Sequence, residues 1–234
     1  MPKLPSFPRW AGRVFLLAAM LAFLGTAFAL HTTTASAHET AWVRVVHAAP
    51  AAGDVDVYVN GGKLLNDFAF ASVTGYVSLP EGSYRIQVAP DGAAIDKSVI
   101  DATVSVKAGK IYTLAALGTS TSGFSLKAFV DSNRVPDDKA SIRVYHLSPD
   151  AGPVDVSVGG TTVIKDLTYR HASGYLKVAP GAYTFDVTAT DVGATVPLSA
   201  TLKADTVYSV FAIGLLKDKP ALTFVVATAP GKGD

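Results

Sequence analysis

Two histidines occupy equivalent positions in a repeated stretch of the sequence, and each is followed by an aspartate at the same spacing. His47 precedes Asp56 by nine residues, as His146 precedes Asp155. A histidine close to a carboxylate can act as a metal ligand or a general base. Each histidine also extends the apolar face of a strand to the start of a proline-containing loop, where an imidazole can hydrogen-bond to loop carbonyls and amides. We therefore predict a structural role for both histidines, with a metal or catalytic site as the alternative.

Two arginines begin the same repeated stretch. We place each arginine and the following aspartate on the outward faces of neighbouring strands, which predicts the ion pairs Arg44–Asp56 and Arg143–Asp155. An exposed cross-strand pair contributes about 0 to 1 kcal/mol. Contact with a carbohydrate or a peptide is the alternative use of these charges. The shared residues to which we assign a mainly structural role are Arg44, His47, Pro50, Asp56, Arg143, His146, Pro149 and Asp155.

Aspartates of the first repeat offer another candidate site, because oxygen ligands suit Ca²⁺ in an exported domain. The candidates are Asp54, Asp56 and Asp67, but the second repeat has Pro153 in place of Asp54, and no Asp-x-Asp-x-Asp-Gly loop occurs. The sequence has five histidines and no cysteine. It also lacks phosphate-binding loops and the Gly-x-Ser-x-Gly and His-Glu-x-x-His motifs. We predict no catalytic residue, no metal ligand and no cofactor.

Aromatic side chains are the remaining candidates for a binding surface. Those shared by both repeats are expected in the core or at corners, with their hydroxyls bonded to the backbone. The shared pairs are Phe70/Tyr169, Tyr76/Tyr175 and Tyr84/Tyr183. Tyr58 and Tyr145 are matched by Ser157 and Val46 and fall on predicted outer faces. These unmatched tyrosines are therefore the better candidates for ligand contact.

A tandem repeat organises the chain. The stretch 44–59 returns 99 residues later as 143–158, and the match continues without a gap well beyond this block. Further along, Tyr112 matches Tyr208 at a spacing of 96, so three residues were lost in a loop. Loss in a loop is expected if one whole domain has been duplicated.

Apolar and polar residues alternate with period two within each repeat, which is typical of β-strands. Turn sequences such as Asn60-Gly61-Gly62 separate the strands. On the first strand we expect one face with Val43, Val45 and His47 and the other with Trp42, Arg44 and Val46. Seven or eight short strands in about 90 residues predict an all-β sandwich, with a closed barrel as the alternative. The expected strands of the first repeat include 42–47, 55–59, 73–79, 84–88, 102–106, 111–117 and 124–130.

The first 37 residues have the features of a secretory signal: a basic start, the apolar run 14–30 and a small-residue site ending at Ala37. We predict cleavage after Ala37. A retained signal anchor is the alternative, because 17 apolar residues lie at the lower limit for spanning a bilayer. The expected division is a signal peptide, a first sandwich, a linker, a second sandwich and a tail at 1–37, 38–131, 132–140, 141–228 and 229–234.

Composition restricts the partners of the mature chain. Without the three basic residues of the leader, 17 Lys and Arg remain against 19 Asp and Glu. A net charge near −2 provides no basic surface for nucleic acid or for anionic membrane. The absence of cysteine excludes disulfides and lipidated cysteine anchors. We expect no membrane span after cleavage, and the composition gives no basis for an oligomeric state.

The repeated pattern Arg-Val-x-His-x-x-Pro followed by Gly-x-Val-Asp-Val-x-Val resembles the DUF4397 family of bacterial exported proteins. Both copies carry the pattern, at 44–59 and 143–158, and the resemblance covers nearly all of the mature chain. It implies an extracytoplasmic, immunoglobulin-like β-sandwich domain, commonly in tandem, without a defined biochemical role. It brings no catalytic residues to assign.

Two classes of function follow from these observations. The first is a secreted or cell-surface, non-enzymatic module for adhesion, envelope-polymer binding or structure, with envelope polysaccharide or a surface protein as partner. The second is a hydrolase of surface polymers that uses carboxylates from both domains. A hydrolase needs a cleft that holds two carboxylates about 5 to 10 Å apart, whereas a binding module needs only an exposed patch. A sensor domain held in the membrane by an uncleaved leader is a third hypothesis.

Overall fold

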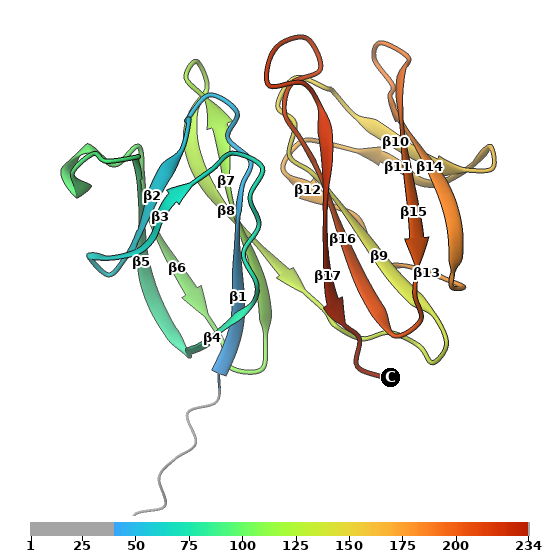
Figure 1. Cartoon of the computed structure of the whole chain (residues 1–234), viewed down its shortest axis with the longest axis horizontal. Helices are drawn as coiled ribbons and strands as arrows, with labels where there is room; N and C mark the ends of the chain where they lie inside the picture. Colours follow the sequence, from blue (N-terminus) through green and yellow to red (C-terminus); the bar gives the residue numbers. More distant parts are fainter. Residues whose placement is uncertain (1–39, 234) are drawn as a thin grey trace, which may run out of the picture. The chain divides into compact units, whose positions relative to one another are not determined.

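The structure, a computed structural model, describes residues 40–233, in which all regular elements except one short helix are β-strands (Figure 1). A single-turn 3₁₀ helix, η1 (Ile95–Lys97), interrupts the strands of the first repeat. The predicted leader 1–37, its cleavage after Ala37 and its alternative as an anchor lie outside the described residues. In the part of the chain that the structure describes, no helix is long and apolar enough to cross a membrane.

The first repeat forms two four-stranded sheets that pack face to face. One sheet has the strand order β4-β1-β7-β8 and the other has the order β3-β2-β5-β6. Strand β1 pairs antiparallel with β4 and parallel with β7, so the start of the repeat joins a strand that comes late in it. The strands are β1 (Thr40–His47), β2 (Val55–Val59), β3 (Gly62–Phe68), β4 (Val77–Pro80), β5 (Gly82–Pro90), β6 (Ile100–Val106), β7 (Ile111–Thr119) and β8 (Gly123–Asp131).

The second repeat has the same plan. Its sheets have the orders β12-β9-β16-β17 and β11-β10-β14-β15, β13 also pairs with β9, and β9 is parallel to β16. The all-β prediction is confirmed, and separate open sheets in each repeat exclude the closed barrel. The strands are β9 (Ala140–His146), β10 (Val154–Val158), β11 (Thr161–Leu167), β12 (His171–Ala172), β13 (Leu176–Val178), β14 (Gly181–Ala189), β15 (Ala194–Leu202), β16 (Thr206–Ile213) and β17 (Thr223–Pro230).

Turn residues explain where several strands end. Asn60 and Gly61 have φ angles of 49° and 86°, as expected for the predicted tight turn between β2 and β3. Gly118 has a φ of 112°, and a Cβ there would collide with the backbone of Gly123 on the neighbouring strand β8. Its counterpart Gly214 has the same restriction against Ala221. The matched glycine is thus required by a close backbone approach.

Each sandwich has its own apolar core, built from equivalent positions. Valines of β2 and β5 in the first sandwich correspond to valines of β10 and β14 in the second, for example Val57 and Val156. The predicted linker also contains a buried residue, because Val135 is 1% exposed and its N–H donates to the Lys232 carbonyl. Residues 132–140 are therefore fastened to the C-terminal end of the second repeat.

A third apolar cluster joins the two repeats. It lies between the sheets β4-β1-β7-β8 and β12-β9-β16-β17, so β1 and β9 are covered on both faces. Each repeat presents the equivalent face to the other. The equivalent pairs in this cluster are Val46/Tyr145, Ala48/Leu147, Ala115/Phe211 and Leu117/Ile213.

Candidate functional site

His47 stands at the end of β1 and is 1% exposed. Its Nε2 donates to the Gly53 carbonyl at 2.8 Å, and its Nδ1 accepts from the Ala49 N–H at 3.3 Å. With Nδ1 as an acceptor, the ring is the neutral tautomer that carries its proton on Nε2. Burial also lowers the pKa of His47 below its ordinary value, which favours the same neutral form. The predicted bonding to the loop that contains Pro50 is confirmed.

His146 repeats this arrangement at the end of β9. Its Nε2 bonds to the Gly152 carbonyl at 2.6 Å, across the loop that contains Pro149, and burial lowers its pKa. The two histidines differ at Nδ1, which at His146 has no hydrogen-bond partner among the described residues. The geometry agrees with a structural role, which stays a prediction for both histidines.

The predicted ion pairs Arg44–Asp56 and Arg143–Asp155 are wrong. Each arginine lies on one sheet of its sandwich and the aspartate on the other, because β1 and β2 are in different sheets, as are β9 and β10. Asp56 instead accepts from Lys63 Nζ on β3 at 2.6 Å. This bond is the main cause that lowers the pKa of Asp56. Asp155 accepts from the Asp166 N–H at 2.7 Å.

Arg44 is only 2% exposed and points into the contact between the repeats. Its Nε donates to Thr113 Oγ1 at 2.8 Å within the first sandwich, and its Nη2 donates to Ser209 Oγ of the second at 2.7 Å. Thr113 and Ser209 are equivalent positions of the two repeats. The guanidinium also stacks over the rings of Tyr76 and Phe211, at 4.6 and 5.1 Å. A single arginine thus bonds across both sandwiches.

Asp131, at the end of β8, is the acceptor at the centre of this polar network, and its side chain is 2% exposed. Its carboxylate accepts from Arg143 Nη1 at 2.8 Å, from the Tyr145 hydroxyl at 2.6 Å and from the Tyr76 hydroxyl at 3.1 Å. The Thr113 hydroxyl also donates to it, and the Arg44 guanidinium lies 3.7 Å away. The carboxylate is therefore fully engaged in holding the two repeats together.

Both tyrosines that the sequence placed on outer faces are buried, so that prediction is wrong. Tyr145 is 0% exposed because the face on which it lies is covered by the first sandwich. Burial and the neighbouring Asp131 raise its pKa, so its hydroxyl stays protonated and donates. Tyr58 is 8% exposed because the segment after β5 covers it, and its hydroxyl bonds to the Ala93 carbonyl at 3.4 Å.

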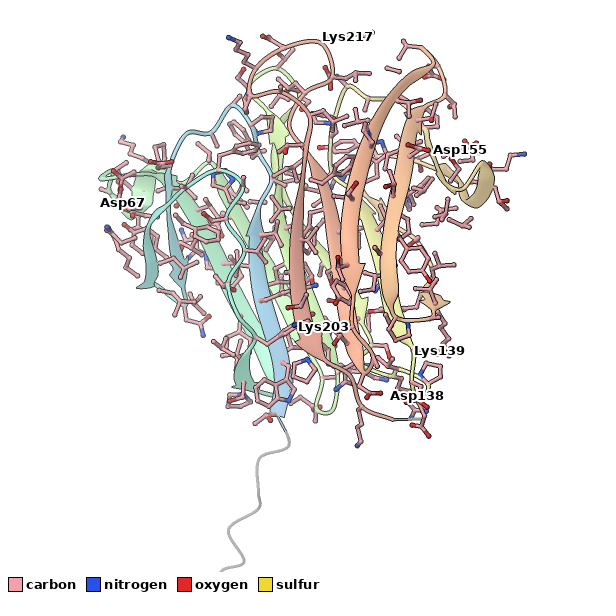
Figure 2. All side chains as sticks on the ribbon, turned by 45° about the vertical axis from the view of Figure 1, so that its right-hand side comes forward. Asp67, Asp138, Lys139, Asp155, Lys203 and Lys217 are labelled. Atoms are coloured by element: carbon pink, nitrogen blue, oxygen red, sulfur yellow. The ribbon has the colours of Figure 1, made fainter. Side chains whose placement is uncertain are left out.

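The aspartates considered for calcium do not form a metal centre. The negative charge of the neighbouring Asp91 is the main cause that raises the pKa of Asp67. Asp56 forms an ion pair with Lys63. Within residues 40–233 no group of three or more His, Asp or Glu side chains is placed to hold a metal ion. Figure 2 shows Asp67 and Asp155 on opposite sides of the molecule, so these carboxylates do not meet.

A groove of about 370 Å³ lies where the two repeats meet. Trp42, which is 47% exposed, and Tyr76 are the aromatic residues of its lining. Ser132 and Asn133 of the interdomain segment add polar atoms, and the second repeat contributes apolar side chains that include Val207. The groove thus combines exposed aromatic surface with hydrogen-bonding groups and has no carboxylate in its lining.

Trp42 was not singled out from the sequence, although the signal was present. It is matched by Ser141 in the second repeat, so it satisfies the criterion of an unmatched aromatic that selected Tyr58 and Tyr145. What the sequence could not show is which unmatched aromatic remains exposed, because that depends on the contact between the repeats.

The family assignment rests on both repeats. Residues 41–157 and 140–234 each match the domain of unknown function DUF4397. The chain belongs to the DUF4397 family. A comparison with curated proteins finds no match for this DUF4397 protein.

Solved structures give only distant similarities. A proposed cell adhesion protein from Bacteroides ovatus is 12% identical, with 81% of this chain and 97% of that chain covered and a TM-score of 0.24. A proposed cell adhesion protein from Bacteroides eggerthii is 8% identical, with coverages of 83% and 97% and a TM-score of 0.22. A fimbrial anchor protein from Porphyromonas gingivalis is 10% identical, with coverages of 80% and 95% and a TM-score of 0.21. At such TM-scores these structures assign no function to the DUF4397 protein.

Proposed function

We propose that this DUF4397 protein is an exported, non-enzymatic module that binds a carbohydrate polymer of the cell envelope in the groove between its two repeats. The observation that supports the proposal is the lining of the groove, in which an exposed indole stands beside amide and hydroxyl groups. The proposal of export depends on the predicted leader. The carbohydrate polymers of the cell envelope are the first that an exported protein meets.

The chemistry of the groove suits a sugar ring. The apolar face of a sugar can pack on the exposed indole of Trp42, which offers a large and rigid surface. The side-chain amide of Asn133 can both donate to and accept from sugar hydroxyls. A volume of about 370 Å³ lies within the usual range of ligand sites.

The alternative, a hydrolase that uses carboxylates from both domains, has less support. Glycoside hydrolysis generally needs two carboxyl groups about 5 to 10 Å apart on either side of the scissile bond. Asp131 is the carboxylate buried between the repeats, and it is engaged by two arginines, two tyrosines and a threonine. The groove itself is lined by no acidic residue.

A pull-down with isolated envelope polysaccharide and peptidoglycan tests the proposal. The protein is purified as residues 38–234, which include all the residues that the structure describes. We expect saturable binding that Trp42→Ala weakens and Val192→Ala leaves unchanged, because Val192 is an exposed apolar side chain outside the groove. Equal binding with calcium and with EDTA is expected. Loss of polymer mass during incubation would instead favour the hydrolase, and absence of binding to every fraction would contradict the proposal.

A further inference from the structure

We infer that the first sandwich binds a single alkyl chain between its two sheets, at a site separate from the proposed carbohydrate groove. A cavity of about 300 Å³ lies inside this sandwich. Its walls come from both sheets, with Val43 and Leu114 on one side and Val57, Leu65 and Val88 on the other. Protein interiors are normally close-packed, so a cavity of this size requires an explanation.

The second sandwich is an internal control for this cavity. The equivalent space between its sheets measures only about 10 Å³. Ile86 of the first sandwich is matched by Phe185 in the second, and its cross-strand partner Ala102 is matched by Leu198. Phe185 and Leu198 both border the small space that remains in the second sandwich, so these larger side chains occupy part of the volume that is open in the first. The fold itself does not demand a cavity.

The cavity offers no free hydrogen-bonding group. Only two lining side chains carry polar atoms, His47 and Thr74. Both ring nitrogens of His47 are bonded to loop backbone, and Thr74 Oγ1 accepts from the Val45 N–H and donates to the Gly75 carbonyl, each at 2.9 Å. A buried water needs two to four polar partners, so the space does not suit water. The part of a ligand that enters it must be hydrocarbon.

The cavity is accessible from one edge of the sandwich. Leu64 on β3 and Val77 on β4 belong to its lining, yet they are 57% and 51% exposed. Both strands are at the ends of their sheets, whereas on the opposite edge β6 packs against β8. A chain can therefore enter between β3 and β4 and leave a polar headgroup in solvent. In the second sandwich the matching residues Val163 and Leu176 are half-buried.

The volume limits the length of the chain. An apolar cavity of about 150 Å³ accommodates benzene. By this measure about 300 Å³ corresponds to a saturated chain of about ten to twelve carbons. A single medium-length acyl chain fits, carried either by a free fatty acid or by a lipid.

Titration with saturated fatty acids of six to fourteen carbons, followed by calorimetry, tests this inference on residues 38–234. Affinity should rise about fourfold for each added methylene until the cavity is full, and then level off. The variant Ile86→Phe/Ala102→Leu, which copies the second sandwich, should weaken binding at least tenfold, because it removes space for two or more methylenes. Leu64→Asp at the exposed edge provides a second variant that leaves the core intact, and it should also weaken binding.

Two further arms identify the site and the source of the chain. Phe185→Ile/Leu198→Ala should create a second binding site, in the second sandwich. Vesicles of phosphatidylglycerol, compared with free decanoate, distinguish a lipid from a free acid as the donor of the chain. Saturable binding of either, lost in the filled variant, supports the inference. No binding of any alkyl probe, or binding that the filled variant retains in full, would overturn it without affecting the carbohydrate proposal.

Discussion

The two sandwiches share one framework but differ in what the framework encloses. Matched residues define turns, loop hydrogen bonds and core valines in both, while the interior volume falls from about 300 Å³ in the first to about 10 Å³ in the second. Larger side chains in the second sandwich at unmatched positions, Phe185 for Ile86 and Leu198 for Ala102, contribute to this difference. Residues that the repeats share thus maintain the common fold. Residues that differ between the repeats are the better candidates for function.

The same contrast holds at the contact between the repeats. Arg44 and Arg143 are equivalent, but Asp131 has no acidic counterpart. Asp131 pairs with Ile111 across the hairpin, and the equivalent pairing in the second repeat joins Val207 to Ala229. One carboxylate therefore serves two arginines, of which Arg44 is buried and Arg143 is partly exposed.

Removing that carboxylate should have the largest effect. Asp131→Ala leaves the buried guanidinium of Arg44 without its counter-charge, and we expect a loss of about 3 to 5 kcal/mol in the free energy of unfolding. Chemical denaturation measures the loss. Asp96→Ala is the matched control, because Asp96 is 69% exposed and its pair with Lys97 should have no measurable effect. A small loss at Asp131 would mean that the apolar cluster alone holds the two repeats together.

Exchanging the residues at one core position between the sandwiches should change the free energy of unfolding by an intermediate amount. The change should be a loss in the second sandwich and a gain in the first. Leu198→Ala creates a cavity in the second sandwich and should cost about 2 kcal/mol, at the low end for such changes because Leu198 is only partly buried. Ala102→Leu fills space in the first sandwich and should stabilise it by about 0.5 to 2 kcal/mol. Thermal and chemical denaturation of both variants provide the comparison. Destabilisation by Ala102→Leu would show that the first core cannot accept the larger side chain.

The buried histidines should make stability depend on pH. Burial lowers the pKa of both His47 and His146, so in the folded state they stay neutral below the ordinary value of about 6.5. The unfolded chain then binds more protons, and the free energy of unfolding should fall as pH falls below about 6.5. Each histidine contributes at most about 1.4 kcal/mol per pH unit. Denaturation of His47→Gln and His146→Gln between pH 7 and pH 5 should show shallower slopes; unchanged slopes would assign the dependence to other groups.

The smallest effect is expected at the ion pair Arg85–Asp101, which only the first sandwich has. The second has Thr184 and Pro197 at these positions. The pair is 59% and 44% exposed, so solvent and salt screen it. Asp101→Asn should therefore leave the free energy of unfolding at pH 7 unchanged within error, at low salt and at 1 M salt. A reproducible loss confined to low salt would mean that the pair contributes more than its exposure implies.

Local features of the fold could be read from the sequence because local rules govern them. Period-two alternation predicted the strands, Asn60 and Gly61 predicted a tight turn, and His47 was expected to bond to loop backbone. These features depend on neighbours within a few residues. The match between the repeats then extended each prediction to the second half of the chain.

The contact between the repeats could not be read in the same way. Arg44 resembles a residue of a solvated strand face, and its counter-charge Asp131 lies 87 residues further along the chain. The order of the strands in the chain also led to a wrong prediction. The ion pair Arg44–Asp56 assumed that β1 and β2 are neighbours in one sheet, but they lie in different sheets. The candidate site was missed for the same reason, since the exposure of Trp42 depends on where the second repeat packs.

The equivalent faces that meet between the repeats have a consequence for assembly. A contact in which both partners use the same surface is the arrangement of a two-fold symmetric dimer. In such a dimer of identical chains every residue is present twice, and any change occurs in both halves at once. Fusion into one chain removes this constraint. The first half can therefore have an aspartate at position 131 while the equivalent position of the second half is Ala229. The chain thus has the contact of a symmetric dimer, with two halves that are free to differ in sequence.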